Sequence, residues 1–142
     1  MKRSALFLPA LALTFGFLTG CGGSDEDPLT HDEFVTQADK ICSDGNADLA
    51  DAAGSLDPND EAAVSSFVTD TLVPNIQDQH DAIEDLSPPE DDEDSVDDML
   101  SSLQEGLDQL SDDPSLITSD TDIFGDANTA AEDLGLTECG SN

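Results

Sequence analysis

Carboxylates dominate this chain, which holds 34 Asp and Glu residues but only 3 Lys and Arg residues, for a formal net charge of −31 at pH 7. Charged side chains are almost never buried unless they are paired, so most of the sequence must face solvent. Self-repulsion at this charge destabilises a compact state, and we expect salt or divalent ions to help folding. The charge also excludes ordinary binding to nucleic acid, which needs Lys and Arg to neutralise phosphates.

The first 20 residues have the composition of a secretion signal. Met1-Lys2-Arg3 is cationic, and an apolar run from Ala5 to Leu18 follows it. This run is too short for a membrane span, which needs about 20 residues, and its small-residue end is typical of a signal peptide. We therefore predict a signal peptide over residues 1–20, an acidic flexible linker over 21–29 and a folded domain over 30–142.

The junction Leu18-Thr19-Gly20-Cys21 resembles the bacterial lipobox. That resemblance implies a diacylglyceryl thioether on Cys21, cleavage after Gly20 and N-acylation, for example by palmitate. Two or three acyl chains form a stable membrane anchor, whereas one holds weakly. The protein would then lie on the extracytoplasmic face of the cell membrane. Ordinary cleavage nearby, which leaves Cys21 as a free or disulfide-bonded thiol, is the alternative.

The domain needs a covalent staple because its apolar core is small. Beyond residue 20 the aromatic residues are Phe34, Phe67 and Phe124, and a domain of about 110 residues is marginal. A Cys42–Cys139 disulfide, which persists outside the cytoplasm, would close a loop of 139 − 42 = 97 residues and contribute about 4.7 kcal/mol in the chain-entropy model. Redox chemistry is the rival interpretation, but acidic neighbours do not favour a reactive thiolate.

Apolar residues recur at helical spacing through the domain. We predict helices from about His31 to Ala53, from Asp57-Pro58 to Ser87, from Val96 to Leu110, and from Ile123 to Leu134. Thr30 and Glu33 have the spacing of a capping box for the first helix. Pro74 should kink or split the second helix, and Gly135 should cap the fourth. The fold class is therefore all-α, a small bundle of about four helices stapled by one disulfide.

Metal-binding patterns in the chain are incomplete. Asp44-x-Asn46-x-Asp48 has Leu49 where a calcium loop needs glycine, and Asp120-x-Asp122-x-Phe124-Gly125 has Ala131 where the bidentate Glu belongs. Both patterns are interpreted as helix caps. His80 and Glu84, near Asp81, lack the second His that a zinc site of this kind would use, and His31 is interpreted as a surface residue of the first turn. We predict no metal site.

Three short motifs resemble those of a group of small actinobacterial lipoproteins whose function is uncharacterised. They are Phe34-x-x-Gln37-Ala38-Asp39-x-Ile41-Cys42, Leu86-Ser87-Pro88-Pro89 and Leu134-Gly135-Leu136-x-x-Cys139. The resemblance covers most of the chain after the signal peptide, and it implies a secreted helical domain with one disulfide. It implies no activity.

The acidity has three interpretations. These are a solvated surface in a salt-adapted, acidic proteome, a low-affinity binder of divalent cations, and docking to a basic protein or cell-envelope component. The sequence holds no Ser/His/Asp arrangement and no Gly-rich phosphate loop, so we predict neither an enzyme nor a cofactor. We expect a membrane-anchored interaction or envelope-associated module that meets its partner through an exposed groove beside Pro74; the alternative is a cation-buffering lipoprotein.

Overall fold

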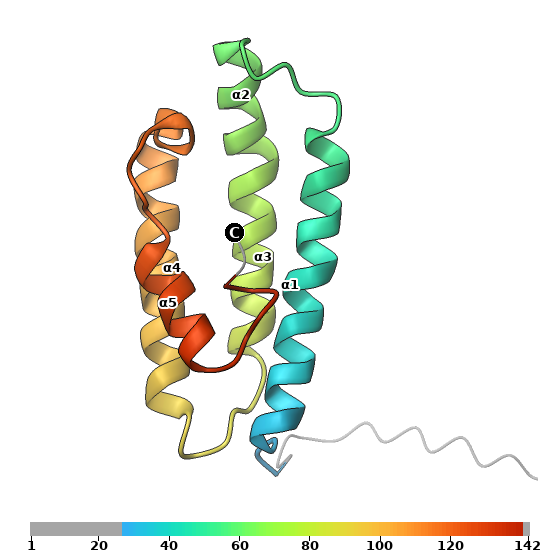
Figure 1. The fold of residues 1–142 in the computed structure, drawn as a ribbon, viewed down its shortest axis with the longest axis vertical. Coiled ribbons are helices and arrows are strands. Elements are labelled where there is room, and N and C mark those ends of the chain that lie inside the picture. Colours follow the sequence, from blue (N-terminus) through green and yellow to red (C-terminus); the bar gives the residue numbers. More distant parts are fainter. Residues whose placement is uncertain (1–26, 141–142) are drawn as a thin grey trace, which may run out of the picture.

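The protein is a bundle of four helical rods. The computed structural model describes residues 27–140, and in that range every regular element is a helix (Figure 1). The rods are α1 (His31–Ala53), a continuous α2 (Glu61–Phe67), η1 (Val68–Leu72) and α3 (Val73–Glu84), then α4 (Glu93–Asp112) and the short α5 (Gly125–Asp133). A 3₁₀ turn, η2 (Pro114–Thr118), follows α4. The predicted all-α class with four helices is confirmed.

Side chains at the start of α1 form the predicted capping box. The Thr30 hydroxyl accepts a hydrogen bond from the Glu33 backbone N–H at 3.4 Å, and the Glu33 carboxylate accepts one from the Thr30 N–H at 3.1 Å. Glu33 also accepts from the Thr30 hydroxyl at 2.7 Å. These bonds satisfy donors that a helix start leaves unpaired, so α1 begins at His31 as the sequence predicts.

The second rod starts later than predicted and changes its helix type beside Pro74. Pro58 lies in a turn, where Asp57 accepts from the Asn59 N–H at 2.9 Å, and α2 starts later because Asp60 caps it. Pro74 lies in the first turn of α3, and the helical rod changes its hydrogen-bond pattern just before it while remaining continuous in the chain. A π-helical turn closed by the Val73 N–H and the Val68 carbonyl precedes it, and this wider turn gives room to a residue that lacks an N–H and crowds the preceding turn.

The last two rods also depart from their predicted bounds. α4 starts at Glu93, three residues before the predicted start at Val96, because carboxylates are favourable in the first turn of a helix. α5 starts only at Gly125, and its N-cap residue, Phe124, makes no side-chain capping bond. Gly135 follows the end of α5 with a φ of 83°, the left-handed conformation that the sequence predicts for it.

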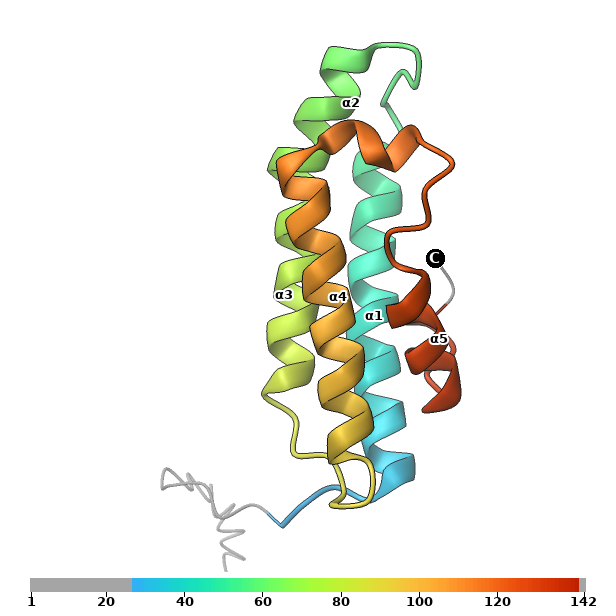
Figure 2. The same cartoon turned by 90° about the vertical axis from the view of Figure 1, so that its left-hand side faces the viewer.

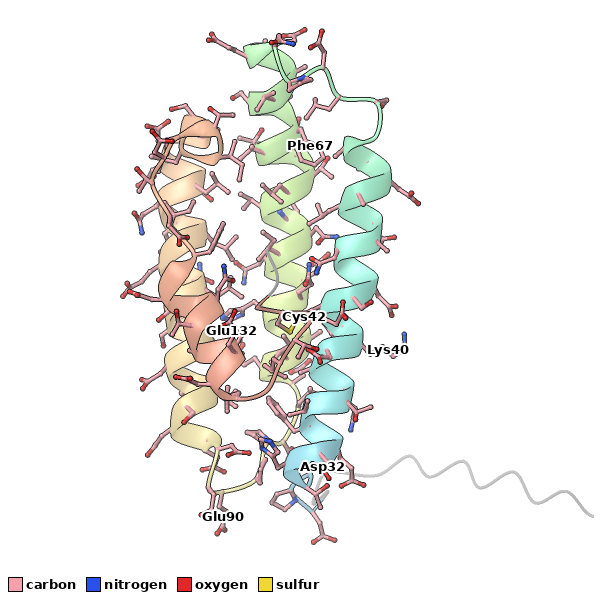
Figure 3. All side chains as sticks on the ribbon, in the orientation of Figure 1. Asp32, Lys40, Cys42, Phe67, Glu90 and Glu132 are labelled. Carbon is pink, nitrogen blue, oxygen red and sulfur yellow. A yellow bond between two sulfur atoms is a disulfide. The ribbon has the colours of Figure 1, made fainter. Side chains whose placement is uncertain are left out.

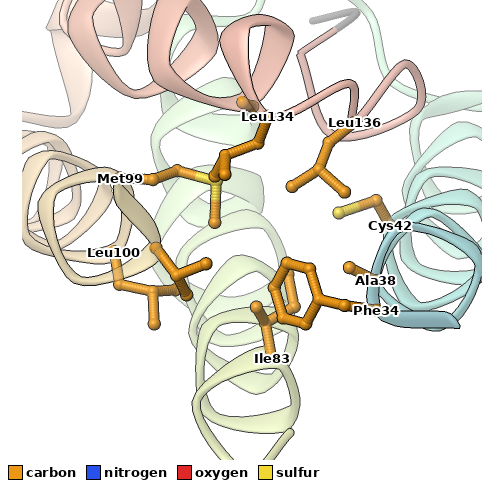
Figure 4. Close-up of a cluster of buried hydrophobic side chains, with 10 residues drawn as sticks. Phe34, Ala38, Cys42, Ile83, Met99, Leu100, Leu134 and Leu136 are labelled. Carbon is orange, nitrogen blue, oxygen red and sulfur yellow. The ribbon is translucent and has the colours of Figure 1, made fainter. Parts of the chain in front are cut away.

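A cluster of buried apolar side chains holds one end of the bundle together. Figure 4 shows side chains from all four rods converging there. Phe34 and Leu136 are both fully buried in this cluster. Its members are Phe34, Ala38, Cys42, Ile83, Val96, Met99, Leu100, Ala131, Leu134 and Leu136.

The chain after α5 turns back and attaches to α1. The Cys42–Cys139 disulfide is present, as predicted. Asp39, one turn before Cys42, accepts from the Thr137 N–H at 3.2 Å and the Glu138 N–H at 2.9 Å. Asn46, one turn after Cys42, donates its side-chain N–H to the Glu138 carbonyl at 3.1 Å. Three turns of α1 therefore hold this segment.

Carboxylates cover the outside of the bundle. Figure 3 shows acidic side chains projecting from every rod, with Asp32 and Glu90 at one end and Glu132 on α5. No polar or charged side chain is buried among residues 27–140. Nor does this part of the chain contain a helix long and apolar enough to cross a membrane. The predicted signal peptide and Cys21 lie outside the described residues.

Candidate functional site

The bundle is open where its fourth rod is too short. α5 has 9 residues, whereas α1 has 23 and α4 has 20. α5 and the chain after it close the core cluster at one end. Beyond α5, the chain beside the long rods consists of η2 and the connector of residues 119–124 (Figure 2). The apolar faces of the long rods consequently lack a full partner there.

A cavity of about 300 Å³ occupies this space. Its floor is shared with the core cluster through Cys42, Ile83, Met99 and Ala131. Its wall consists mainly of aliphatic and aromatic side chains that are only half-buried, namely Leu49, Leu72, Ile76, Leu103 and Phe124. Ligand sites in proteins are typically apolar hollows of about 300–1,000 Å³ with a few polar groups. The cavity has the size and lining of such a site.

Ile117 of η2 stands at the edge of this cavity. Its side chain is 40% exposed, and no other large hydrophobic residue in the described part of the chain is classed as exposed. An isolated exposed isoleucine is ordinary, but this one adds apolar surface beside an apolar hollow. Leu72 and Ile76 flank Pro74 on the second rod and also line the cavity. The hollow thus lies beside Pro74, where the sequence predicts a groove.

Polar groups in the lining are few, and most are neutral. Three amides line the cavity, those of Asn46, Gln79 and Asn128, together with the carboxylate of Asp122. Gln79 donates to the Asn75 side-chain oxygen at 2.7 Å. Position 45 of α1 is glycine, and the Gln79 side chain packs directly against it. A Cβ added at Gly45 would lie 2.3 Å from the Gln79 Nε2 atom. Gly45 therefore gives α1 and α3 their close contact.

A second glycine positions the connector over the cavity. A Cβ on Gly106 would lie 2.6 Å from the Phe124 ring and 2.8 Å from the Ile123 carbonyl oxygen. The connector and the Phe124 ring can therefore approach α4 closely only because position 106 has no side chain. The role of Gly106 was not predicted from the sequence. The available signal was a glycine inside the apolar stripe of the helix predicted from Val96 to Leu110.

The structure also places the acidic patterns considered as metal ligands. Asp44, Asn46 and Asp48 lie inside α1, so this pattern forms neither a calcium loop nor the predicted cap; Asp44 pairs instead with Lys40. Asp122 precedes α5, and its carboxylate lies against Gly125, where a Cβ would be 2.6 Å from the Oδ2 atom. Its position beside a helix start is close to the predicted capping role, although Phe124 is the N-cap residue.

The His80 group is the densest set of metal-ligating atoms in the described residues. One ligand atom each from His80, Asp81 and Glu84 lies within 4.8 Å of the other two. The His80 ring bonds to the Asp81 carboxylate at 3.1 Å. Bonds from the Gln77 amide and from His80 hold the pKa of Asp81 below its usual value of 3.8. Asp81 and Glu84 are exposed on α3, and His80 beside them is half-buried.

His31 has a partner that the sequence did not reveal. It is the first residue of α1 and is exposed, as predicted, and its Nδ1 atom lies 2.7 Å from the Asp92 carboxylate. The Leu29 N–H donates to the Ser87 carbonyl at 2.8 Å nearby. Both contacts attach the start of α1 to the connector between α3 and α4, so they are structural.

No protein-family model matches this chain, and no curated protein or solved structure shows significant similarity to it.

Proposed function

We propose that this protein is a lipid-anchored, extracytoplasmic binding module that takes an apolar group into the cavity beside η2 and catalyses no reaction. The single observation that carries the binding role is the cavity of about 300 Å³ between half-buried apolar side chains. Exposing these side chains to water is unfavourable, at about 25 cal/mol per Å² of apolar surface. An apolar ligand that covers them recovers that free energy.

The anchor half of the proposal is supported by the sequence alone. The cationic start, the apolar run and Leu18-Thr19-Gly20-Cys21 follow one another in the order of a lipoprotein signal. An electrostatic anchor is disfavoured, because 34 acidic residues repel an anionic lipid surface. Attachment must then depend on acyl chains.

Membrane fractionation tests the anchor. Cys21→Ser removes the sulfur that would carry the lipid, so the variant should appear in the medium as a folded soluble domain. The parent protein, with Cys21 present, should sediment with membranes. Ser24→Ala, in the same segment, is the matched control and should remain with the membrane. A Cys21→Ser protein that still sediments with membranes would refute the anchor.

Filling the cavity tests the binding role. Leu49 lines the cavity and is half-buried, so Leu49→Trp places an indole in the space. Leu86 is also half-buried but packs against the core cluster outside the cavity, which makes Leu86→Trp the matched control. Calorimetric titration with octan-1-ol, an uncharged chain that fits the space, should give one-to-one binding for the parent protein and the control.

The affinity of Leu49→Trp for octan-1-ol should fall by about tenfold or more, the equivalent of about 1.4 kcal/mol. Circular dichroism should show that both Trp variants remain helical. Equal affinities in the two variants, or no saturable heat in the parent protein, would contradict a binding role for the cavity.

Low-affinity binding of divalent cations is the second candidate function. The observation that favours it is the convergence of His80, Asp81 and Glu84 on α3, on a surface already rich in carboxylates. Calcium prefers six to eight oxygen ligands, which distributed carboxylates supply only loosely. Saturable calcium binding at micromolar concentration, lost in Glu84→Gln, would favour this candidate. Weak heats that salt suppresses would reject it.

A further inference from the structure

A second hollow shares one lining residue with the apolar cavity. It measures about 430 Å³, and its lining is mainly polar. Three of its residues are acidic, namely Glu105 of α4, Asp122 of the connector and Asp126 of α5. Asp122 lines both this polar hollow and the apolar cavity. A ligand with its apolar part in the cavity can therefore present its polar end to a carboxylate.

The charge of that polar end follows from the residues around it. Neither hollow is lined by a Lys, Arg or His residue among residues 27–140. The three carboxylates are exposed, so their attraction for a cation is strongest at low salt, and the chain carries a large negative charge. An anionic end would be repelled by these carboxylates. A cationic end would be attracted by Asp122, Glu105 and Asp126 together.

Asp122 is held in place for this role. Its carboxylate lies against Gly125, the first residue of α5, at a distance that a side chain on Gly125 would not permit. A helix N-terminus carries a partial positive charge that favours a carboxylate. This contact places the Asp122 carboxylate beside the start of α5, and the residue lines both hollows.

The apolar cavity limits the size of the ligand. A cavity of about 150 Å³ is large enough to bind benzene. The cavity here is about twice as large, at about 300 Å³, so it has room for an apolar body of roughly eight to twelve carbon atoms. A full-length phospholipid exceeds that volume.

We propose that the ligand is a small cationic amphiphile, an amine with an apolar body of roughly eight to twelve carbon atoms, whose body fills the cavity and whose charge faces Asp122. The proposal depends on the binding role proposed above for the same cavity and adds the charge of the ligand. A fatty acid of equal length is the opposite prediction.

A matched series of probes tests the charge preference. The chain contains no Trp and no Tyr, so Ile117→Trp at the edge of the cavity introduces a single fluorescent reporter. We would titrate this variant with octylamine, octan-1-ol and octanoate at neutral pH and low salt. Octylamine should bind about tenfold more tightly than octan-1-ol, and octanoate should bind most weakly. Propylamine, which has the charge without the body, should not saturate.

Substitution of Asp122 tests the residue. Asp122→Asn in the reporter background should remove most of the octylamine advantage while leaving octan-1-ol affinity within about twofold. Asp133→Asn, which neutralises an exposed carboxylate of α5 that lines neither hollow, should keep the full advantage. Unchanged octan-1-ol binding shows that the cavity remains folded in each variant.

The outcomes separate this inference from the function on which it rests. Saturable octan-1-ol binding without an octylamine preference, or an equal loss in Asp122→Asn and Asp133→Asn, would overturn the cationic ligand and leave the apolar site standing. Absence of binding by all three eight-carbon probes, both in the reporter variant and in calorimetric titrations of the parent protein, would overturn both.

Discussion

At the scale of single residues, two glycines position side chains of the site, and one capping pair fixes the start of α1. Gly45 and Gly106 let Gln79 and Phe124 approach neighbouring helices more closely than any side chain would permit. The Thr30–Glu33 capping box could be predicted from local spacing, and it is confirmed. The two close approaches could not, because the residues they admit come from distant parts of the chain, and helix propensity alone marks glycine as unfavourable.

The glycines should differ in their response to an added methyl group. In Gly106→Ala, the new Cβ meets an aromatic ring and a backbone carbonyl, so the connector must move and unfolding free energy should fall by about 1–3 kcal/mol. In Gly45→Ala, the Cβ meets the end of a flexible glutamine, and the better helix propensity of Ala offsets part of the cost. Urea denaturation should rank Gly106→Ala as the less stable variant; the reverse order would contradict the Phe124 contact.

The capping box should make stability depend on pH in a defined window. Bonds from the Thr30 hydroxyl and backbone N–H lower the pKa of Glu33 below its usual value of 4.5. The stabilisation is therefore complete above about pH 4.5, the pKa of the unfolded chain, and is lost as pH falls through the lower folded pKa. Glu33→Gln should have a lower melting temperature than the parent protein at pH 7.

The melting curves of Glu33→Gln and the parent protein should converge as the solution is acidified well below pH 4.5. Comparing the two proteins at each pH removes the effect of the other carboxylates, which titrate in both. A difference in melting temperature that stays constant from pH 7 to pH 3 would show that the Glu33 charge does not stabilise α1.

At the scale of elements, the end of α5 determines how the chain returns to α1. Gly135 adopts a φ of 83°, the Leu136 N–H bonds to the Ala131 carbonyl at 2.8 Å, and the Gly135 N–H bonds to the Glu132 carbonyl at 2.9 Å. This is a Schellman motif. It directs Leu136 into the core and leads the chain toward Cys139.

Gly135→Ala should weaken this return. The space around the position is open, so the cost is the left-handed backbone itself, about 1–2 kcal/mol for a residue with a Cβ. Gly135→Asn should cost less, because Asn tolerates this conformation better. Thermal unfolding of the two variants checks the order, and equal stabilities of Gly135→Ala and the parent protein would mean that the turn can take another form.

Element boundaries were less predictable from sequence than element existence. The four apolar stripes gave four rods, but α2 starts at Asp60's cap and not at Pro58, and the rod passes Pro74 through a π turn. Both outcomes depend on hydrogen bonds of backbone N–H groups, at the start of α2 and in the π turn. The late start of α5 at Gly125 matters most, because it leaves the cavity uncovered.

At the scale of the whole molecule, one small bundle combines a highly charged surface with an apolar cavity. The outside repels itself, and the inside holds an apolar space that packing does not fill. Sequence composition predicted the first property. The second arises from the mismatch in length between α5 and the long rods, so a pattern of apolar residues within each helix could not predict it.

Salt should stabilise the protein markedly. Raising sodium chloride from about 0.01 M to about 1 M shortens the Debye length from roughly 30 Å to 3 Å and screens the repulsion among 34 acidic residues. We expect the melting temperature to rise by several degrees or more, with sucrose of equal osmolality as the control for general exclusion effects. A melting temperature that does not respond to salt would contradict a fold limited by self-repulsion.

Methyl NMR during an octan-1-ol titration reports whether the space between the long rods binds an apolar group. The methyl resonances of Leu103, Ile76 and Ile117, which line the cavity, should shift together and saturate at one equivalent. Those of Leu29 and Leu134, which pack around the core cluster outside the cavity, should stay in place. Shifts spread evenly over both groups, or none at all, would contradict binding in this space.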